Sequence, residues 1–419
     1  MTTQQTFVLV GAGLAGTKAA EALRSEGFAG RVVLVGEEAD RPYDRPPLSK
    51  DYLQDKSEKE KIYLHPEGWY DEHDVELRLD TRVTAIDRAA HQLTIRGGEE
   101  IGYDKLLLAT GSSPRRLPVP GGDLDGVLYL RQLGDCEAIK AAFTTAKRAV
   151  IIGAGWIGLE TAAAARTADV QVTLLETAKL PLLGVLGPEL AQIYAALHAH
   201  HGVELQMGAQ VAEITEVEGR ASGVGLADGS HIDADVVVVG IGITPYTELA
   251  EAAGLTVDNG ILVDEHLQTS DPDIFAAGDV ANAYYPSLGR HLRLEHWSAA
   301  LNQGPVAAAN MAGRTTAYDH VPYFFSDQYD MGMEYWGYVE AGHYDQVVFR
   351  GEVDKGEYIA FWVRKDRVLA AMNVNVWDQG DAMVALIRSG DRVDLARLAG
   401  PGVALEDLIG TSQAEGKAR

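Results

Sequence analysis

Short apolar runs, each followed closely by glycines, recur along the chain and set its organisation. The first run is residues 7–10, Phe-Val-Leu-Val, and it leads directly into Gly11, Gly13 and Gly16 with the spacing G-x-G-x-x-G. Small and apolar residues then follow at helical spacing from Ala19 onward. A continuous apolar run is typical of a parallel strand buried on both faces, and the later spacing is typical of a helix. The pattern therefore predicts a strand, a tight turn and a helix.

The three glycines of this turn have different predicted roles. Gly11 permits the tight turn, Gly13 lets the backbone approach a pyrophosphate, and Gly16 brings the helix close to the strand. The N–H groups at the start of the helix would bind the phosphate charge. A second apolar run, residues 32–35, is followed by Glu37, about 20 residues beyond the last glycine, where a carboxylate accepts from ribose hydroxyls. The whole arrangement predicts a dinucleotide site rather than a turn shaped by packing alone.

The same pattern occurs a second time. Residues 149–152 are apolar and lead into Gly153, Gly155 and Gly158, and a later apolar run ends at Glu176. Two complete copies predict two Rossmann-like units, each binding one dinucleotide. Glu176 would accept from a free ribose 2′-hydroxyl, whereas a 2′-phosphate requires a basic residue. The second unit is therefore expected to prefer NADH over NADPH.

The remaining segments complete an α/β architecture. Strands are expected over residues 75–83, 92–95, 103–108 and 235–239, and helices over 66–73 and 188–201. From Pro322 onward the chain is rich in aromatic and β-branched residues, which predicts an antiparallel sheet with short helices at 382–389, 393–398 and 405–409. The polar residues 411–419 are expected to fray. We predict a discontinuous first dinucleotide-binding domain (1–115 and 247–321), a second dinucleotide-binding domain (116–246) and a C-terminal α+β domain (322–419).

Charge and cysteine content exclude several functions. The formal net charge of −25 argues against general binding to nucleic acid or to an anionic membrane. No apolar run approaches the roughly 18 residues of a membrane span, and no cleavable leader is evident, so a cytoplasmic location is expected. The single cysteine, Cys136, excludes an intramolecular disulfide framework. It lies between acidic residues on a helix that we expect to be solvated, where its pKa would be raised.

Three further segments offer candidate chemistry. Residues 41–50 contain three prolines, which predicts a stiff irregular loop that could place Arg45 and Lys50 against a dinucleotide or simply expose them. Asp279 follows a short apolar run at an expected helix start, where it could cap the helix, hold flavin hydroxyls, or do both. Three histidines, His198, His200 and His201, close the predicted helix 188–201, and we favour a helix-dipole interaction over a metal site.

With these motifs in place, the chain resembles the FAD-dependent, NADH-using ferredoxin reductases of bacterial oxygenase and cytochrome P450 systems. The resemblance covers nearly the whole chain and is carried by residues 11–16, 45–50 (Arg-Pro-Pro-Leu-Ser-Lys), 109–111, 153–160, 240–245, 277–279 and 326–328. The Arg-Pro-Pro-Leu-Ser-Lys segment is the most specific of them. The resemblance implies a glutathione-reductase-like layout of two Rossmann-like domains plus the C-terminal domain.

The resemblance also implies a set of site residues. Lys50 and Glu160 would pair beside the isoalloxazine ring, where hydride arrives. The residues implied to bind FAD are Gly11, Gly13, Leu14, Ala15, Gly16, Glu37, Arg45, Lys50, Val83, Ala109, Thr110, Gly111, Arg131, Asp279 and Trp297. Those implied to bind NADH are Gly153, Gly155, Trp156, Ile157, Gly158, Glu160, Glu176 and Gly242. Phe325 stands where the family often has tryptophan.

The implied activity is transfer of hydride from NADH to flavin and of single electrons to a small iron–sulfur ferredoxin that serves a cytochrome P450 or a Rieske dioxygenase. A rubredoxin reductase and a non-catalytic NADH-sensing flavoprotein are the alternatives. A disulfide reductase is nearly excluded, because Cys136 is the only thiol. No metal site is expected in this chain. An acidic ferredoxin would need a local basic spot, for which Arg290, His291, Arg293 and Arg41 are candidates.

Overall fold

The computed structural model of the chain describes residues 4–410, which divide into two compact units. The first unit contains the residues up to Pro47, Ser57–Ser113 and Ile243–His320. The second contains Leu48–Lys56, Pro114–Gly242 and the residues from Val321 onward. The expected frayed end, 411–419, lies outside the described residues. The three-domain division remains a prediction.

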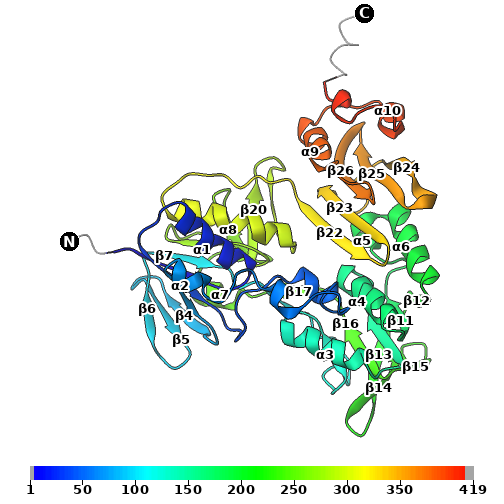
Figure 1. Ribbon diagram of the computed structural model, residues 1–419, viewed down its shortest axis with the longest axis horizontal. Coiled ribbons are helices and arrows are strands. Elements are labelled where there is room, and N and C mark those ends of the chain that lie inside the picture. Colours follow the sequence, from blue (N-terminus) through cyan, green and yellow to red (C-terminus); the bar gives the residue numbers. More distant parts are fainter. Residues whose placement is uncertain (1–3, 411–419) are drawn as a thin grey trace, which may run out of the picture. The chain divides into compact units, whose positions relative to one another are not determined.

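The first unit is built on a five-stranded parallel sheet with the order β19-β7-β1-β2-β3. Figure 1 labels strand β7 of this sheet. Its strands are β1 (Thr6–Val10), β2 (Arg31–Val35), β3 (Val75–Arg78), β7 (Lys105–Leu108) and β19 (Ile274–Ala276). The apolar residues of β1 and β2 are buried, as expected for a sheet covered on both faces. Helices α1 (Leu14–Ser25) and α8 (Trp297–Met311) pack against each other. A Cβ on Gly304 of α8 would lie 2.3 Å from the carbonyl oxygen of Ala15, so glycine is needed for this close packing.

Smaller elements complete the first unit. An antiparallel sheet contains β4 (Val83–Asp87), β5 (Gln92–Ile95) and β6 (Glu100–Gly102), and a second sheet contains β18 (Ile261–Val263), β20 (Ala281–Tyr285) and β21 (Arg290–Leu292). The short helices are α2 (Trp69–Glu72) and α7 (Glu248–Ala252), with 3₁₀ turns at Pro46–Ser49 and Lys59–Ile62. Strands β8 (Ser112–Pro114) and β17 (Ile243–Pro245) pair where the chain passes between the units.

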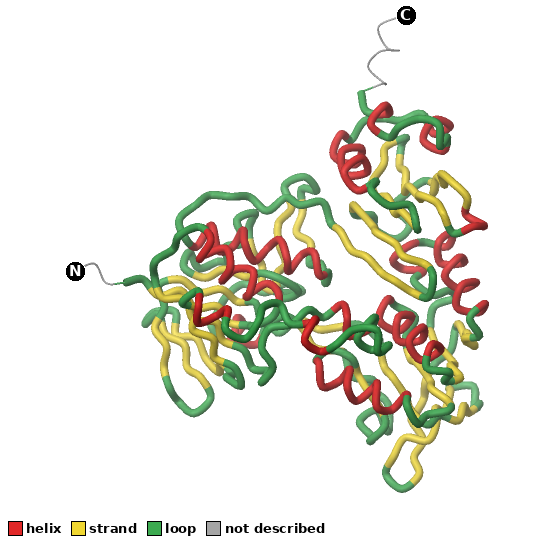
Figure 2. The backbone as a smooth tube through the Cα atoms, viewed as in Figure 1, coloured by secondary structure: helices red, strands yellow, loops and turns green. Residues whose placement is uncertain are grey.

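The second unit contains its own five-stranded parallel sheet, with the order β12-β11-β10-β16-β9. The strands are β9 (Val127–Tyr129), β10 (Arg148–Ile152), β11 (Gln171–Glu176), β12 (Val203–Met207) and β16 (Val236–Val239). Its helices are α3 (Leu133–Phe143), α4 (Trp156–Thr167), α5 (Leu183–Leu186) and α6 (Pro188–His200). An antiparallel sheet, β13 (Val211–Val217), β14 (Arg220–Leu226) and β15 (His231–Asp233), follows, and β13 and β14 form the long hairpin visible in Figure 2.

The C-terminal part of the second unit is an antiparallel sheet with the order β22-β23-β26-β25-β24. Its strands are β22 (Tyr323–Gln328), β23 (Met331–Gly337), β24 (Gln346–Glu352), β25 (Glu357–Arg364) and β26 (Arg367–Val374). The helices α9 (Gly380–Ser389) and α10 (Leu395–Ala399) and 3₁₀ turns at Val353–Lys355 and Glu406–Leu408 accompany the sheet. Along β22 the side chains alternate, so that Ser326 and Gln328 are buried while Asp327 is exposed.

The predicted fold class is confirmed, with three local differences. The strand expected over 75–83 is two strands, because Asp80 adopts a positive φ of 47° and ends the extended run. The proline segment is not wholly irregular, since Pro46–Ser49 forms a 3₁₀ turn, whose first positions tolerate proline. The third predicted C-terminal helix is only a 3₁₀ turn. Within residues 4–410, every helix is too short or too polar to cross a membrane.

Candidate functional site

The first glycine turn joins β1 to α1 and leaves room at one position only. Gly11 has φ +117°, and a Cβ there would lie 2.0 Å from the carbonyl oxygen of Ala109. A Cβ on Gly16 would lie 2.0 Å from the carbonyl oxygen of Gly11. A Cβ on Gly13 would meet no atom within 4 Å. The chain's own packing therefore requires Gly11 and Gly16, whereas the space above Gly13 is available to a ligand that approaches the backbone.

The second glycine turn, between β10 and α4, repeats this arrangement. A Cβ on Gly153 would lie 2.4 Å from the carbonyl oxygen of Gly240, and one on Gly158 would lie 1.9 Å from that of Gly153. A Cβ on Gly155 would again meet nothing within 4 Å. The sequence predicted these three roles from spacing alone, and the second unit provides an independent example of them.

Both glycine turns open onto the start of a helix. The N-cap residues are Gly13 for α1 and Gly155 for α4, and neither offers a side chain to the first N–H groups. These N–H groups, with the positive end of the helix dipole, suit a pyrophosphate. A phosphate-linked dinucleotide therefore fits both turns. The other predicted turn residues, Leu14, Ala15, Trp156 and Ile157, form the first positions of these helices.

The acid of the second unit folds back onto its own turn. One oxygen of the Glu176 carboxylate accepts from the Ala154 N–H at 2.8 Å, and the other accepts from the Ala178 N–H at 2.8 Å and the Thr177 hydroxyl at 3.0 Å. Burial acts to raise the pKa of Glu176, and these backbone hydrogen bonds outweigh it, so that the pKa lies below its usual value. The carboxylate is thereby kept ionised beside the turn.

The acid of the first unit is placed differently. The side chain of Glu37 is 57% exposed and lies 3.1 Å from Arg82 and 3.7 Å from Arg96. Its neighbour Glu38 accepts from Arg45 at 2.9 Å and also from the hydroxyl of Tyr43. Glu38 thus holds the predicted FAD residue Arg45, and no sequence motif marks Glu38 as its partner.

Asp279 does not begin a helix, so its predicted N-cap role is wrong. It lies in the turn between β19 and β20, where a strand follows, and its carboxylate accepts from the Ser112 hydroxyl at 2.9 Å. Residues 109–111 follow β7, the neighbour of β19 in the sheet, and Gly111 has φ +72°. The Thr110 hydroxyl donates to the carbonyl oxygen of Tyr246 at 3.0 Å. Binding of flavin hydroxyls at the carboxyl ends of the strands stays the prediction for Asp279.

The other predicted FAD residues are spread over both units. Val83 begins β4 and is 5% exposed, and the Trp297 indole N–H donates to Asp44 at 2.8 Å at the start of α8. These two residues belong to the first unit, whereas Arg131, between β9 and α3, belongs to the second. Gly242 ends a segment of the second unit with φ +100°, and its carbonyl oxygen accepts from the Arg115 N–H at 2.9 Å.

A buried ion pair lies within the second unit. The Lys50 ammonium is 2.7 Å from the carboxylate of Glu160, and the two side chains are 12% and 3% exposed. Glu160 also accepts from the hydroxyls of Ser326, at 2.7 Å, and of Ser49. The Lys50 ammonium lies 5.3 Å from the ring centre of Phe325, within cation–π range. Such a pair fixes a positive charge in a site with little access to water.

One of the three histidines, His198, and the cysteine differ from expectation. His198 is fully buried, and burial lowers its pKa to about 4, so a charged imidazole at the helix dipole is wrong for this residue. Cys136 lies on α3 as predicted, but it is fully buried rather than solvated. Burial, more than the neighbouring acids, raises its pKa to about 12. Within residues 4–410, no group of three histidine, cysteine or acidic side chains could hold a metal ion.

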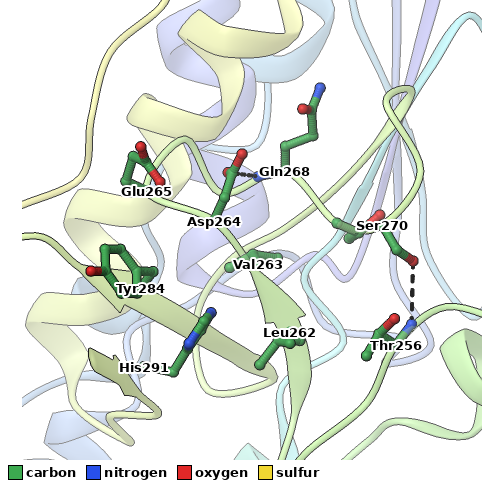
Figure 3. A pocket seen from close by; sticks show the side chains of 10 residues that line it. Thr256, Leu262, Val263, Asp264, Glu265, Gln268, Ser270, Tyr284 and His291 are labelled. Carbon is green, nitrogen blue, oxygen red and sulfur yellow. Dashed lines mark hydrogen bonds between the residues drawn. The ribbon is translucent and has the colours of Figure 1, made fainter. Parts of the chain in front are cut away.

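A separate hollow of about 400 Å³ lies in the first unit, and no residue of the first glycine turn lines it (Figure 3). Figure 3 shows Asp264, Gln268 and His291 among the side chains around it. The Asp264 carboxylate accepts from the backbone N–H groups of His266 and Gln268 at 2.9 Å, so it stabilises its own loop. None of the predicted cofactor residues lines this hollow, and we assign it no function.

Comparisons with known proteins identify the family. Residues 5–304 match the model described as pyridine nucleotide-disulphide oxidoreductase, and residues 323–409 match the model described as reductase C-terminal. The chain belongs to the pyridine nucleotide-disulphide oxidoreductase family. The first match includes both glycine turns, and the second begins at β22, the strand that carries Ser326.

Relatives within the pyridine nucleotide-disulphide oxidoreductase family are similar over nearly their full length. Rhodocoxin reductase of Rhodococcus erythropolis is 42% identical, over 88% of this chain and 86% of that protein. The anthranilate 1,2-dioxygenase system ferredoxin–NAD(+) reductase component of Burkholderia cepacia is 42% identical, over 96% of this chain and 99% of that protein. The reductase in a crystal structure of the covalent putidaredoxin reductase–putidaredoxin complex matches with a TM-score of 0.93 and 38% identity, over 98% and 99% of the two chains.

Proposed function

We propose that this chain is an FAD-containing ferredoxin reductase that takes hydride from NADH and passes single electrons to a small iron–sulfur ferredoxin. The observation that carries the proposal is that each unit contains a complete nucleotide turn, while Cys136 is buried with a pKa raised to about 12. A disulfide reductase needs a reactive thiolate, and this thiol is protonated at neutral pH. The similarity of this chain to the reductases named above supports a ferredoxin as the acceptor of the electrons.

Family membership implies FAD and NADH as the cofactors. We assign FAD to the first glycine turn and NADH to the second, where the ionised Glu176 suits a ribose with a free 2′-hydroxyl. Bound flavin supplies the redox chemistry, because it accepts two electrons from NADH and releases them singly. The chain itself binds and orients the nucleotides and excludes water. Lys50 would contribute a fixed positive charge, and Glu160 would hold it in place.

The partner would be a ferredoxin of a cytochrome P450 or Rieske dioxygenase system, and a rubredoxin is the second candidate. Four basic residues were candidates for docking the partner. The prediction is wrong for Arg293, because its side chain is 6% exposed and its guanidinium lies 2.6 Å from the carboxylate of Glu295. Arg41 pairs with Glu60 and lies 3.9 Å from the ring centre of Tyr63. Arg290 and His291 are exposed on β21 and remain candidates. A cytoplasmic location remains a proposal, to be tested by cell fractionation.

The activity can be tested with the purified flavin-loaded protein. In anaerobic stopped-flow mixing, we expect NADH to reduce the bound flavin rapidly. In a steady-state assay, we expect added ferredoxin to accelerate the NADH-driven reduction of cytochrome c several-fold. Acceleration by rubredoxin instead of ferredoxin would select the second candidate. Rapid reduction by NADH with no acceleration by either protein would contradict an electron-transfer role and favour the sensing flavoprotein.

The Lys50→Met variant tests the ion pair in the same assay. We expect it to lower the limiting rate of flavin reduction at saturating NADH about tenfold or more while NADH affinity changes little, because the charge acts on the reacting centre. An unchanged limiting rate would remove Lys50 from the mechanism without affecting the assignment of the two nucleotides.

A further inference from the structure

A continuous hydrogen-bond chain connects the buried carboxylate of Glu160 to His198 on α6. Ser326 lies 2.7 Å from Glu160, the Gln328 side-chain amide lies 3.0 Å from the Ser326 hydroxyl, and the His198 Nε2 lies 2.8 Å from the other end of that amide. All four side chains are between 0% and 3% exposed. Water has little access to replace any member of the chain, so each polar atom depends on its neighbour.

The donor and the acceptor of each hydrogen bond in this series can be assigned by starting from the carboxylate of Glu160. The Glu160 carboxylate, paired with Lys50, can only accept, so the Ser326 hydroxyl donates to it and must accept from Gln328. The Gln328 –NH₂ group therefore faces Ser326, and its carbonyl oxygen faces His198. Consequently His198 carries its proton on Nε2 and donates. Its pKa, lowered to about 4 by burial, keeps the ring neutral, so this single donor is fixed.

We propose that His198, Gln328 and Ser326 are positioning residues for the Lys50–Glu160 pair. The proposal rests on the proposed function of that pair. An amide cannot pass a proton along the chain, so the chain acts by orientation: each donor points toward Glu160 and fixes the next. His198 thereby determines which way the Gln328 amide lies, and Ser326 holds the carboxylate against Lys50. A residue that contacts no predicted nucleotide-binding turn would in this way set the geometry at the reacting centre.

Loss of the terminal donor would propagate along the chain. Without His198 Nε2–H, the carbonyl oxygen of Gln328 is left unpaired in the interior, which favours rotation of its side chain toward another donor. Ser326 then loses the donor that fixes its hydroxyl, and Glu160 loses a bond that fixes its carboxylate. Small displacements of groups beside a reacting centre lower rates far more than they lower binding. The effect should therefore appear in the limiting rate of flavin reduction and not in NADH affinity.

The test compares matched variants of the flavin-loaded protein. His198→Phe keeps an aromatic ring but removes the donor, and we expect it to lower the limiting rate of reduction by NADH about tenfold with the NADH Kd changed by less than about twofold. His198→Gln places an amide donor near the position of Nε2 and should restore the rate to within about threefold of the parent. His200→Gln is the control: this side chain, two residues further along α6, is exposed and is not a member of the hydrogen-bond chain. It should leave the rate unchanged.

A double-mutant cycle separates transmission from packing. If His198 acts through Ser326, then His198→Phe should have little further effect on the rate in a Ser326→Ala background. Equal effects of His198→Phe in both backgrounds, or an equal loss in His198→Phe and His198→Gln, would show that His198 only fills space. A parental limiting rate in His198→Phe would overturn the proposal directly.

The flavin-free protein offers a readout that does not depend on activity. Nitrogen NMR of the His198 ring should show a neutral imidazole protonated on Nε2 at pH 7. Protonation on Nδ1 would contradict the derived direction and overturn the proposal, even if the protein proves to be a ferredoxin reductase. Conversely, a parent protein that NADH fails to reduce would contradict the proposed function, and the tautomer would still test the hydrogen-bond chain.

Discussion

The two glycine turns have the same backbone plan but different acids. In each turn, the first and third glycines are required because a Cβ would overlap a carbonyl oxygen, and the middle glycine faces open space. Glu176 returns to its own turn and accepts from two backbone N–H groups, whereas Glu37 is exposed and lies beside two arginines. The backbone of such a site is thus fixed by the fold, and the acid is the part that each unit adjusts. Four predictions test this comparison between the two units, and they run from the largest expected effect to the smallest.

The largest effect should separate two neighbouring glycines. Gly11→Ala forces a Cβ to within 2.0 Å of a carbonyl oxygen at a positive φ, and we expect a loss of about 4 kcal/mol or more in the free energy of unfolding. Gly13→Ala should fold with a melting temperature close to the parent's but bind FAD at least tenfold more weakly. Denaturation curves and flavin occupancy measure both. A Gly13→Ala protein with full FAD affinity would mean that the open space is not the pyrophosphate site.

One histidine in each unit has a lowered pKa, and these two residues should make both units sensitive to acid. Burial lowers the pKa values of His198 and His296 to about 4. Between about pH 6.5 and 4 the unfolded chain binds protons that the folded chain does not, so stability falls as pH falls through this window. We expect each histidine to account for about 2 kcal/mol of lost stability between pH 7 and pH 5.

Urea denaturation at these two pH values measures this loss. His198→Gln should reduce the loss by about half, because one of the two titrating groups is removed. His200→Gln provides the control, since His200 is exposed on the same helix and should leave the pH dependence unchanged. Equal pH dependence in the parent and His198→Gln would show that His198 titrates normally.

Much of this arrangement could be predicted from the sequence, because it depends on neighbours along the chain. The glycine turns, their strands and their helices follow from spacing within about 30 residues. The surroundings of Glu160 could not be predicted from spacing, since Ser49 and Ser326 are 111 and 166 residues away from it. The burial of Cys136 likewise depends on tertiary packing. One signal was present: Ser326 and Gln328 occupy alternate positions of a strand, so they share a face.

The next effect concerns the acid of the second unit. Glu176→Arg should reduce the preference for NADH over NADPH at least tenfold, or about 1.4 kcal/mol, because a carboxylate repels a 2′-phosphate and an arginine attracts it. The ratio of kcat/KM for the two nucleotides measures this change. Glu176→Gln keeps an oxygen for the Ala154 N–H but lacks the charge, and it should lie between the parent and Glu176→Arg. A ratio unchanged in Glu176→Arg would show that Glu176 only stabilises its turn.

The smallest effect should be at the exposed acid of the first unit. Glu37→Gln should change the free energy of unfolding by less than about 1 kcal/mol, because exposed ion pairs contribute little. If Glu37 also binds the FAD ribose, the FAD Kd should rise about fivefold or less. Fluorescence titration of the flavin-free protein measures this change. A loss of stability as large as that of Gly11→Ala would mean that the two acids do not differ as their exposure indicates.

The order of segments in the first unit has a consequence for synthesis on the ribosome. In the first unit, strand β7 pairs with β19 and helix α1 packs against α8. Both β19 and α8 come later in the sequence than most of the second unit, so they are synthesised after it. At about 5–20 residues per second, the edge of β7 waits on the order of ten seconds or more for its neighbour. An apolar strand with an unpaired edge can form hydrogen bonds with a strand of another chain and so aggregate. The nascent protein should therefore depend on chaperones more than a chain of the same length whose domains are completed one after the other.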